Sequence, residues 1–85
     1  MKRALTYEEF LKQVKKTAMN LSQYDGAEER VDAALEENES ICKEHFNAAV
    51  AAFEKHKEHY IKNDHAEWRF VNEADAAGYV ISMLA

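Results

Sequence analysis

The sequence predicts a single all-α domain over residues 1–85, an elongated bundle of three helices with one long central helix. The chain has no proline and two glycines, whereas an all-β chain needs turn residues about every ten positions. Its apolar residues recur three and four positions apart, which is the period of an amphipathic helix. Three capping-box patterns, which begin at Thr6, Asp25 and Asp64, divide the chain into three helices.

The first helix is expected over about residues 7–23. Thr6 and Glu9 have the spacing of a capping box, and Leu5 and Phe10 have that of a hydrophobic staple. One face of this helix is apolar, and the opposite face is basic. The apolar face comprises Tyr7, Phe10, Leu11, Val14, Ala18, Leu21 and Tyr24. The basic residues are Lys12, Lys15 and Lys16.

The central helix is expected over about residues 26–62, with Asp25 and Glu28 as its capping box. Asn38-Glu39-Ser40 is a candidate break that would divide it in two. The apolar stripe keeps its phase through this segment, and this favours one continuous helix. The stripe contains Ala27, Val31, Ala34, Leu35, Asn38, Cys42, His45, Phe46, Ala49, Ala52, Phe53, His56 and Tyr60. A helix of this length spans roughly 55 Å, so either the shorter helices lie in tandem along it or two chains pack as a homodimer.

The last helix is expected over about residues 65–84, and its Ala74-x-x-x-Gly78 pattern predicts a close helix crossing. Besides a core stripe, a second line of residues shares one face. This line comprises Trp68, Asn72, Asp75, Tyr79 and Met83. Aromatic residues are favoured anchors at interfaces, and Met adapts to irregular surfaces. We interpret the line as a partner-binding face, with burial in the core or a dimer interface as alternatives.

Acidic residues are concentrated in one part of the chain, whose net charge is −5. Residues 20–44 carry eight acidic side chains and two basic ones. Several acidic pairs are four residues apart on the central helix, where like charges cost a few tenths of a kcal/mol. This concentration of acidic residues has two interpretations. One is a solvated helix face, and the other is docking on a basic protein partner through residues such as Glu36, Glu37 and Glu39. Direct nucleic-acid binding is not expected, because it needs clustered Lys and Arg.

Self-association is a second expectation for the central helix. Asn38 and His45 are polar residues within an apolar seam, and one such residue often fixes register and oligomeric state. Val50 and Ile61 fall off the main stripe and extend the candidate oligomer interface.

Catalytic and metal chemistry are not expected. Cys42-x-x-His45 and His56-x-x-His59 resemble a zinc pattern, but on one continuous helix His45 and His56 lie about 16 Å apart along the axis. Cys42 and His45 are one turn apart within the apolar stripe, where burial favours an inert thiol. No phosphate-binding loop or nucleophile motif occurs in the sequence, so we expect no enzyme, no metal and no cofactor.

The expected function is that of a non-enzymatic, cytoplasmic, helical protein-binding module. The N-terminus lacks the apolar run of a signal peptide, and no stretch is long and apolar enough for a membrane span. Short, acidic, all-helical composition is typical of small phage and mobile-element proteins that inhibit a host enzyme or defence complex, such as an anti-CRISPR. The alternatives are a structural or regulatory homo-oligomer, and a metal- or pH-responsive protein that uses His45, His56 and His59.

Overall fold

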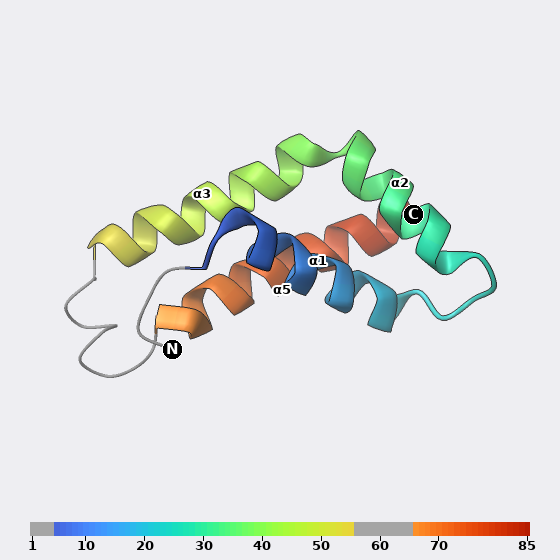
Figure 1. The fold of residues 1–85 in the computed structure, drawn as a ribbon, viewed down its shortest axis with the longest axis horizontal. Coiled ribbons are helices and arrows are strands. Elements are labelled where there is room, and N and C mark those ends of the chain that lie inside the picture. Colours follow the sequence, from blue (N-terminus) through green and yellow to red (C-terminus); the bar gives the residue numbers. More distant parts are fainter. Residues whose placement is uncertain (1–4, 56–65) are drawn as a thin grey trace.

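In the computed structural model, residues 5–55 and 66–85 are described, with side chains for residues 5–55 and 70–85. These ranges contain four helices (Figure 1): α1 over Tyr7–Leu21, α2 over Ala27–Glu37, α3 over Glu39–Lys55 and α5 over Ala66–Leu84. The described residues contain no strand, which confirms the all-α prediction for this part of the chain.

Helix α1 begins at the predicted capping box. The Thr6 backbone N–H donates to the Glu9 carboxylate at 3.0 Å, and the Glu9 N–H donates to the Thr6 hydroxyl at 3.2 Å. Leu5 and Phe10, the predicted staple, both lie in the core. The helix ends at Leu21, two residues before the predicted end.

The capping box predicted at Asp25 and Glu28 is wrong. Gly26 is the N-cap residue of α2, and no side chain caps this helix. Gly26 has φ of 81°, a left-handed conformation that glycine adopts without steric cost. The tight turn ends with a hydrogen bond of 3.1 Å from the Ala27 N–H to the Tyr24 carbonyl.

The prediction of one central helix over residues 26–62 is also wrong, because the chain bends at Asn38 between α2 and α3 (Figure 1). The Ala34 carbonyl accepts two hydrogen bonds of 2.9 Å from Asn38, one from the backbone N–H and one from the side-chain amide. The Ile41 N–H then donates to the Asn38 carbonyl at 3.0 Å, while the helical bond from Cys42 is stretched to 3.5 Å. An Asn side chain that competes for backbone partners favours such a bend.

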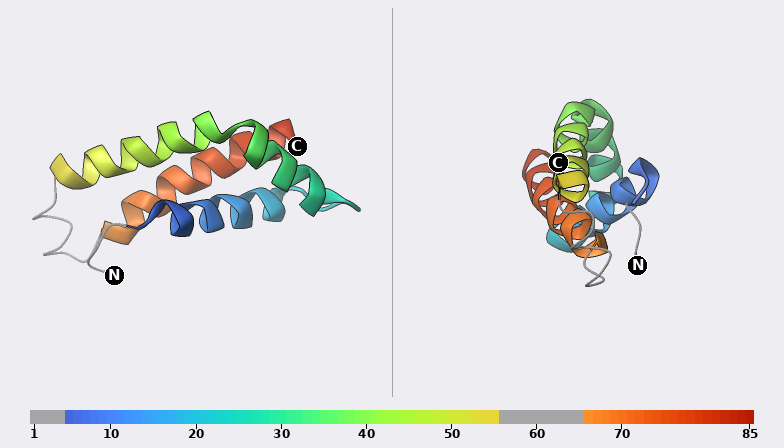
Figure 2. Two further views of the ribbon diagram at one scale, coloured as in Figure 1. Left: turned by 45° about the horizontal axis from the view of Figure 1, so that its top comes forward. Right: turned by 90° about the vertical axis from the view of Figure 1, so that its left-hand side faces the viewer.

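Helix α5 lies between the other helices and packs most extensively against α1 and α3 (Figure 2). It runs parallel to α1 and antiparallel to α3. The predicted close crossing at Gly78 is confirmed, since a methyl group there would lie 2.7 Å from the Thr17 Cβ and 2.9 Å from the Val14 carbonyl. The capping box predicted at Asp64 lies outside the described residues.

The core runs along the contact between these helices. Phe46 is its aromatic centre, with ring centroids 5.2 Å from Tyr7, 5.3 Å from Phe10 and 6.0 Å from Phe70. The buried cluster contains Leu5, Phe10, Val14, Ala18, Val31, Ala34, Cys42, Ala49, Phe53, Phe70, Ala74, Ala77 and Ile81. Of the eleven described residues of the stripe predicted for the central helix, six are buried, although that helix bends. These six are Ala27, Val31, Ala34, Cys42, Ala49 and Phe53, and Leu35 and Phe46 pack against the core.

The molecule measures 43 × 21 × 17 Å along its principal axes. The longest described helix has 19 residues, which corresponds to roughly 29 Å. Because no described helix approaches 55 Å, the geometric reason for expecting a homodimer no longer applies.

Candidate protein-binding face

Six acidic residues follow one side of α2 and its two ends. They form the acidic face, which comprises Asp25, Glu28, Glu29, Asp32, Glu36 and Glu39. All six are exposed, and each lines one of two hollows beside α1. Within α2, Glu28, Asp32 and Glu36 are four residues apart and lie on one side of the helix. Asp25 precedes the N-cap residue Gly26, and Glu39 is the first residue of α3.

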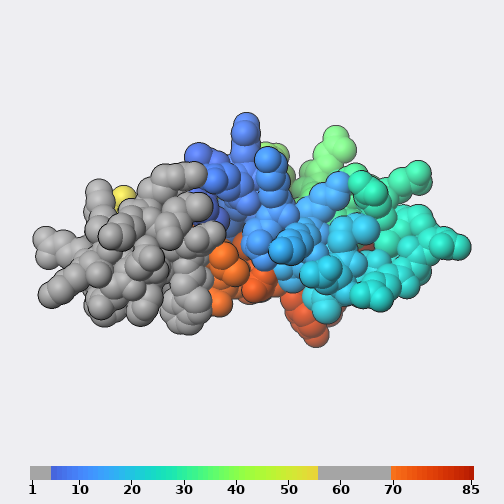
Figure 3. Space-filling model, turned by 60° about the horizontal axis from the view of Figure 1, so that its bottom comes forward, coloured from blue at the N-terminus to red at the C-terminus, as the bar shows by residue number. Residues whose placement is uncertain are grey.

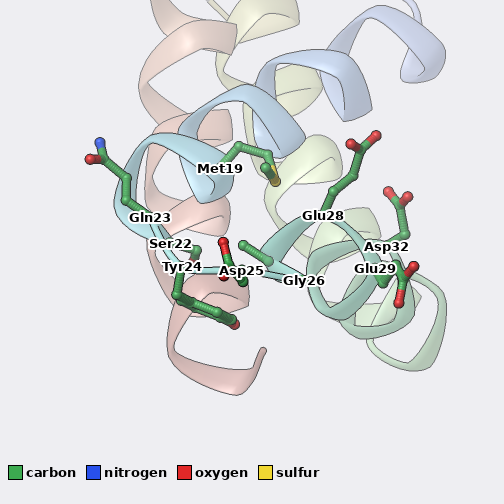
Figure 4. A pocket seen from close by; sticks show the side chains of 10 residues that line it. Met19, Ser22, Gln23, Tyr24, Asp25, Gly26, Glu28, Glu29 and Asp32 are labelled. Carbon is green, nitrogen blue, oxygen red and sulfur yellow. The ribbon is translucent and has the colours of Figure 1, made fainter.

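The first hollow lies between the end of α1 and the beginning of α2 (Figure 4). Its volume is about 830 Å³. Asp25, Glu28, Glu29 and Asp32 contribute carboxylates to its wall, and the carboxylates of Glu28, Glu29 and Asp32 extend outward from α2. This hollow is wide and strongly acidic.

The second hollow is a groove of about 360 Å³ between α1 and α2. Its apolar floor consists of Tyr7, Leu11 and Leu35, which are half-buried and pack against the core. Its acidic rim consists of Asp32, Glu36 and Glu39. Asp32 lines both hollows, so the acidic face is continuous from one to the other.

Part of this negative charge is compensated within the chain. The Lys15 ammonium lies 3.2 Å from Glu28 and 3.0 Å from Asp32. The hydrogen bond to Asp32, and to a smaller extent the one to Glu28, raises the pKa of Lys15. Lys43 lies 3.2 Å from Glu39. Among the described residues, Glu36 has no ion-pair partner. The charge of Glu36 is therefore available to a partner.

Tyr7 lies at the boundary between the groove and the core. Its ring contacts Phe46 edge-on, and its hydroxyl is buried without a hydrogen-bond partner in the described part of the chain. Burial raises the pKa of Tyr7, and the nearby Cys42 and Glu39 raise it further. The hydroxyl therefore stays protonated at neutral pH.

The sequence-predicted acidic residues fall in different places. Glu36 and Glu39 lie together on the rim of the groove. Glu37 is exposed but lines neither hollow. The groove floor was missed by the sequence reasoning, which assigned Tyr7, Leu11 and Leu35 to apolar core faces.

The four residues of the predicted line on α5 whose side chains are described, Asn72, Asp75, Tyr79 and Met83, are all exposed, so burial of this line in the core is wrong for them. Asp75 also contacts α1, where it accepts hydrogen bonds from Thr17 at 2.6 Å and Gln13 at 3.2 Å. The Trp68 side chain lies outside the described residues.

The residues predicted for an oligomer interface have contacts within the chain. The Asn38 amide donates to Ala34, and His45 Nδ1 lies 3.0 Å from a Glu73 carboxylate oxygen. Val50 is half-buried against the core. Ile61 lies outside the described residues. The interface itself stays a prediction.

The described residues hold no group of three His, Cys, Asp or Glu that could bind a metal ion. The Cys42 thiol is fully buried, and burial raises its pKa, with a smaller contribution from Glu39. His56 and His59 lie outside the described residues. Among the helices described, none is long and apolar enough to cross a membrane.

Comparisons with family models, with curated proteins and with solved structures found no match for this chain.

Proposed function

We propose that this chain is a non-enzymatic protein-binding module that docks on a basic surface of a partner protein through its acidic face. The observation that carries the proposal is the acidic face, whose six exposed carboxylates line two adjoining hollows beside α1. Close like charges on one helix destabilise that helix. A positively charged partner would relieve this repulsion.

The charge balance around the acidic face supports the proposal. Helix α2 carries five acidic side chains and one basic one, Arg30. Lys15 compensates Glu28 and Asp32, whereas Glu36 has no ion-pair partner among the described residues. Fields of one sign over a concave surface accelerate the encounter with an oppositely charged protein.

A nucleic-acid-handling complex is the partner class that we favour. Such proteins carry clustered Lys and Arg that neutralise phosphates, and a row of carboxylates offers the same ionic partners. Occupation of that surface would block nucleic-acid binding. The short, acidic, helical composition suits the inhibitors that phages and mobile elements encode, of which an anti-CRISPR is one form.

A matched pair of charge-reversal variants tests the proposal. The face variant carries Glu29→Lys, Glu36→Lys and Glu39→Lys, which leave the two carboxylates paired with Lys15 in place. The control variant reverses the same number of exposed acidic residues outside the acidic face. Its substitutions are Glu8→Lys, Glu44→Lys and Glu54→Lys.

The measurement is capture of proteins from a bacterial lysate, with and without an excess of double-stranded DNA. We expect the wild type and the control variant to retain the same DNA-competed proteins, and the face variant to lose them. Equal retention by both variants would contradict docking through the acidic face. Retention that DNA does not compete would contradict the favoured partner class.

A homo-oligomer is a second candidate function, and the end of α5 supports it. Tyr79, Met83 and Leu84 are 58%, 69% and 53% exposed, and residues 76–85 carry no charged side chain. Figure 3 shows this end of α5 projecting beside α1. Leu21, which is 54% exposed, follows Thr17 by four residues on α1, as Tyr79 follows Asp75 on the parallel helix α5.

Light scattering over a concentration series tests self-association. A dimer that forms through this patch dissociates when Tyr79→Ser and Met83→Ser are combined, while the helical content stays unchanged. A wild-type monomer at all concentrations would reject the homo-oligomer.

A further inference from the structure

We propose that the groove between α1 and α2 seats the apolar side of a basic amphipathic helix supplied by the partner protein. This inference rests on the proposed function and specifies which element of the partner the acidic face recognises. Three features of the groove carry it: its apolar floor, its acidic rim and its position between two helices.

The apolar floor requires more than a charged ligand. Tyr7, Leu11 and Leu35 line the groove while packing against the core, so they are held in place before any partner arrives. The volume of about 360 Å³ lies within the range of about 300–1,000 Å³ found for ligand pockets. A purely ionic docking surface gains nothing from such a floor, whereas an apolar anchor side chain gains the free energy of burial.

The acidic rim favours a partner segment with positively charged residues on either side of its apolar anchor. Asp32, Glu36 and Glu39 follow one another at intervals of four and three residues, next to Leu35. Asp32 and Glu36 lie about one turn apart on α2, and Glu39 follows at the beginning of α3. Lys and Arg on a partner helix that lies along α2 can pair with Glu36 directly, and with Asp32 and Glu39 by displacing Lys15 and Lys43.

The position between two helices favours a helical ligand over an extended one. Side chains on neighbouring helices leave grooves that the ridges of another helix fill. Recognition of an amphipathic helix in such a groove relies on anchors at positions i, i+3, i+4 and i+7. An extended strand would need an open sheet edge, and the described residues contain no strand.

Three synthetic peptides probe this inference by fluorescence anisotropy at low and high salt. The first is an 18-residue amphipathic helix of Leu and Lys, in which Leu occupies one face. The second replaces every Leu with Ala and keeps the charge. The third keeps the composition of the first and has two central Pro residues that break the helix.

We expect the first peptide to bind at least tenfold more tightly than the other two. In the protein, Leu11→Ala with Leu35→Ala is expected to weaken binding of the first peptide at least tenfold. Glu36→Gln with Glu39→Gln is expected to weaken it similarly and to reduce its salt dependence. Glu44→Gln with Glu54→Gln, the matched control, changes it less than twofold.

A second readout covers the case in which the Leu variant unfolds. Methyl NMR of the wild-type protein is expected to show shifts at Leu11 and Leu35 on addition of the first peptide, while buried Ile81 stays unchanged. Equal binding of the Leu and Ala peptides, equal binding of the Pro peptide, or no binding of the first peptide would each overturn the inference. The lysate experiment above tests the acidic face separately, so its outcome distinguishes failure of the groove from failure of the proposed function.

Discussion

The Thr17 hydroxyl donates a hydrogen bond of 2.6 Å to the Asp75 carboxylate, and this bond joins α1 to α5. The same carboxylate oxygen accepts a second hydrogen bond from the Gln13 amide at 3.2 Å. Asp75 therefore fixes the register of the two parallel helices one turn before Gly78, where α5 lies too close to α1 for a side chain. Asp75 was predicted to bind a partner, and in the structure it joins two helices of its own chain.

Replacement of Asp75 by Ala is expected to lower the free energy of unfolding by about 1 kcal/mol, because two hydrogen bonds to a charged acceptor are lost at an exposed site. Asn72→Ala, at an exposed position on the same helix, is the control and should change it by less than about 0.5 kcal/mol. Urea unfolding of the two variants measures the difference. Equal effects would show that the Asp75 contacts add nothing to the helix pair.

Gly78→Ala is expected to destabilise the fold by about 1–3 kcal/mol, the usual effect of overpacking. The added methyl would lie 2.7 Å from the Thr17 Cβ and 2.9 Å from both the Thr17 Cγ2 and the Val14 carbonyl. Thr17→Ser removes only the Cγ2 contact, so it should rescue the variant in part. Thermal unfolding measures the effect, for which 1 kcal/mol corresponds to roughly 4–8 °C in Tm. Full rescue would mean that neither the Thr17 Cβ contact nor the Val14 carbonyl contact matters.

The sequence predicted the helical class, the first capping box and most of the core, because these depend on local spacing. It did not predict the bend at Asn38, because an apolar stripe reports which side of a helix is buried and not whether the axis is straight. Here the Ala34 carbonyl accepts both nitrogen donors of Asn38, and the stripe continues in phase. At Gly26, a left-handed backbone conformation replaced the expected side-chain cap.

The candidate site was also predicted only in part, because a sequence pattern reports local features and not how closely two helices approach. The charges of Glu36 and Glu39 can be recognised in a sequence, since exposed acids on a helix are a local feature. The groove floor cannot, because Leu35 has the pattern of a core residue. Its partial exposure depends on how closely α1 approaches α2, which is a property of the tertiary structure. The same limit applies to Asp75, whose partners are 58 and 62 residues away in the chain.

Tyr7→Phe is expected to stabilise the protein by about 1 kcal/mol. The Tyr7 hydroxyl is buried without a hydrogen-bond partner among the described residues, and an unsatisfied buried polar group costs about 1–3 kcal/mol. Phe keeps the ring contact with Phe46. Urea unfolding tests this, with Phe46→Leu as the comparison that removes the ring contact and should destabilise. A less stable Tyr7→Phe variant would reveal that the hydroxyl has a partner.

Stability is expected to fall as the pH rises above about 9, and Cys42 contributes to the fall. Burial raises the pKa of this thiol above its ordinary value of 9.0 in the folded chain. At a pH between the ordinary pKa and the raised pKa of the folded chain, the unfolded chain loses the thiol proton and the folded chain keeps it. The unfolded state is therefore favoured as the pH rises. Cys42→Ala should have a shallower decline in urea stability between pH 8 and 10. An identical slope would show that the thiol ionises equally in both states.

Reagent access to Cys42 provides an independent check on its burial. The thiol is fully buried in the folded chain, and the thiolate is the reactive form. Modification by a thiol reagent at pH 8 is therefore expected to be slow in buffer and rapid in denaturant. Rapid modification in buffer would contradict the described position of Cys42.

Substitutions at Tyr79 and Met83 test what the α5 line does. Two interpretations remain, a partner-binding face and a dimer interface, and the third is a structural role in the core. The side chains of Tyr79 and Met83 are 58% and 69% exposed, whereas Phe70 on the same helix is fully buried. Tyr79→Ala with Met83→Ala should therefore cost the monomer less than about 1 kcal/mol, and Phe70→Ala about 3–5 kcal/mol. Urea unfolding at low and high protein concentration measures both. A loss that appears only at high concentration would assign Tyr79 and Met83 to a dimer interface, because mass action links stability to association. A large loss at every concentration would instead place them in the core and contradict their exposure.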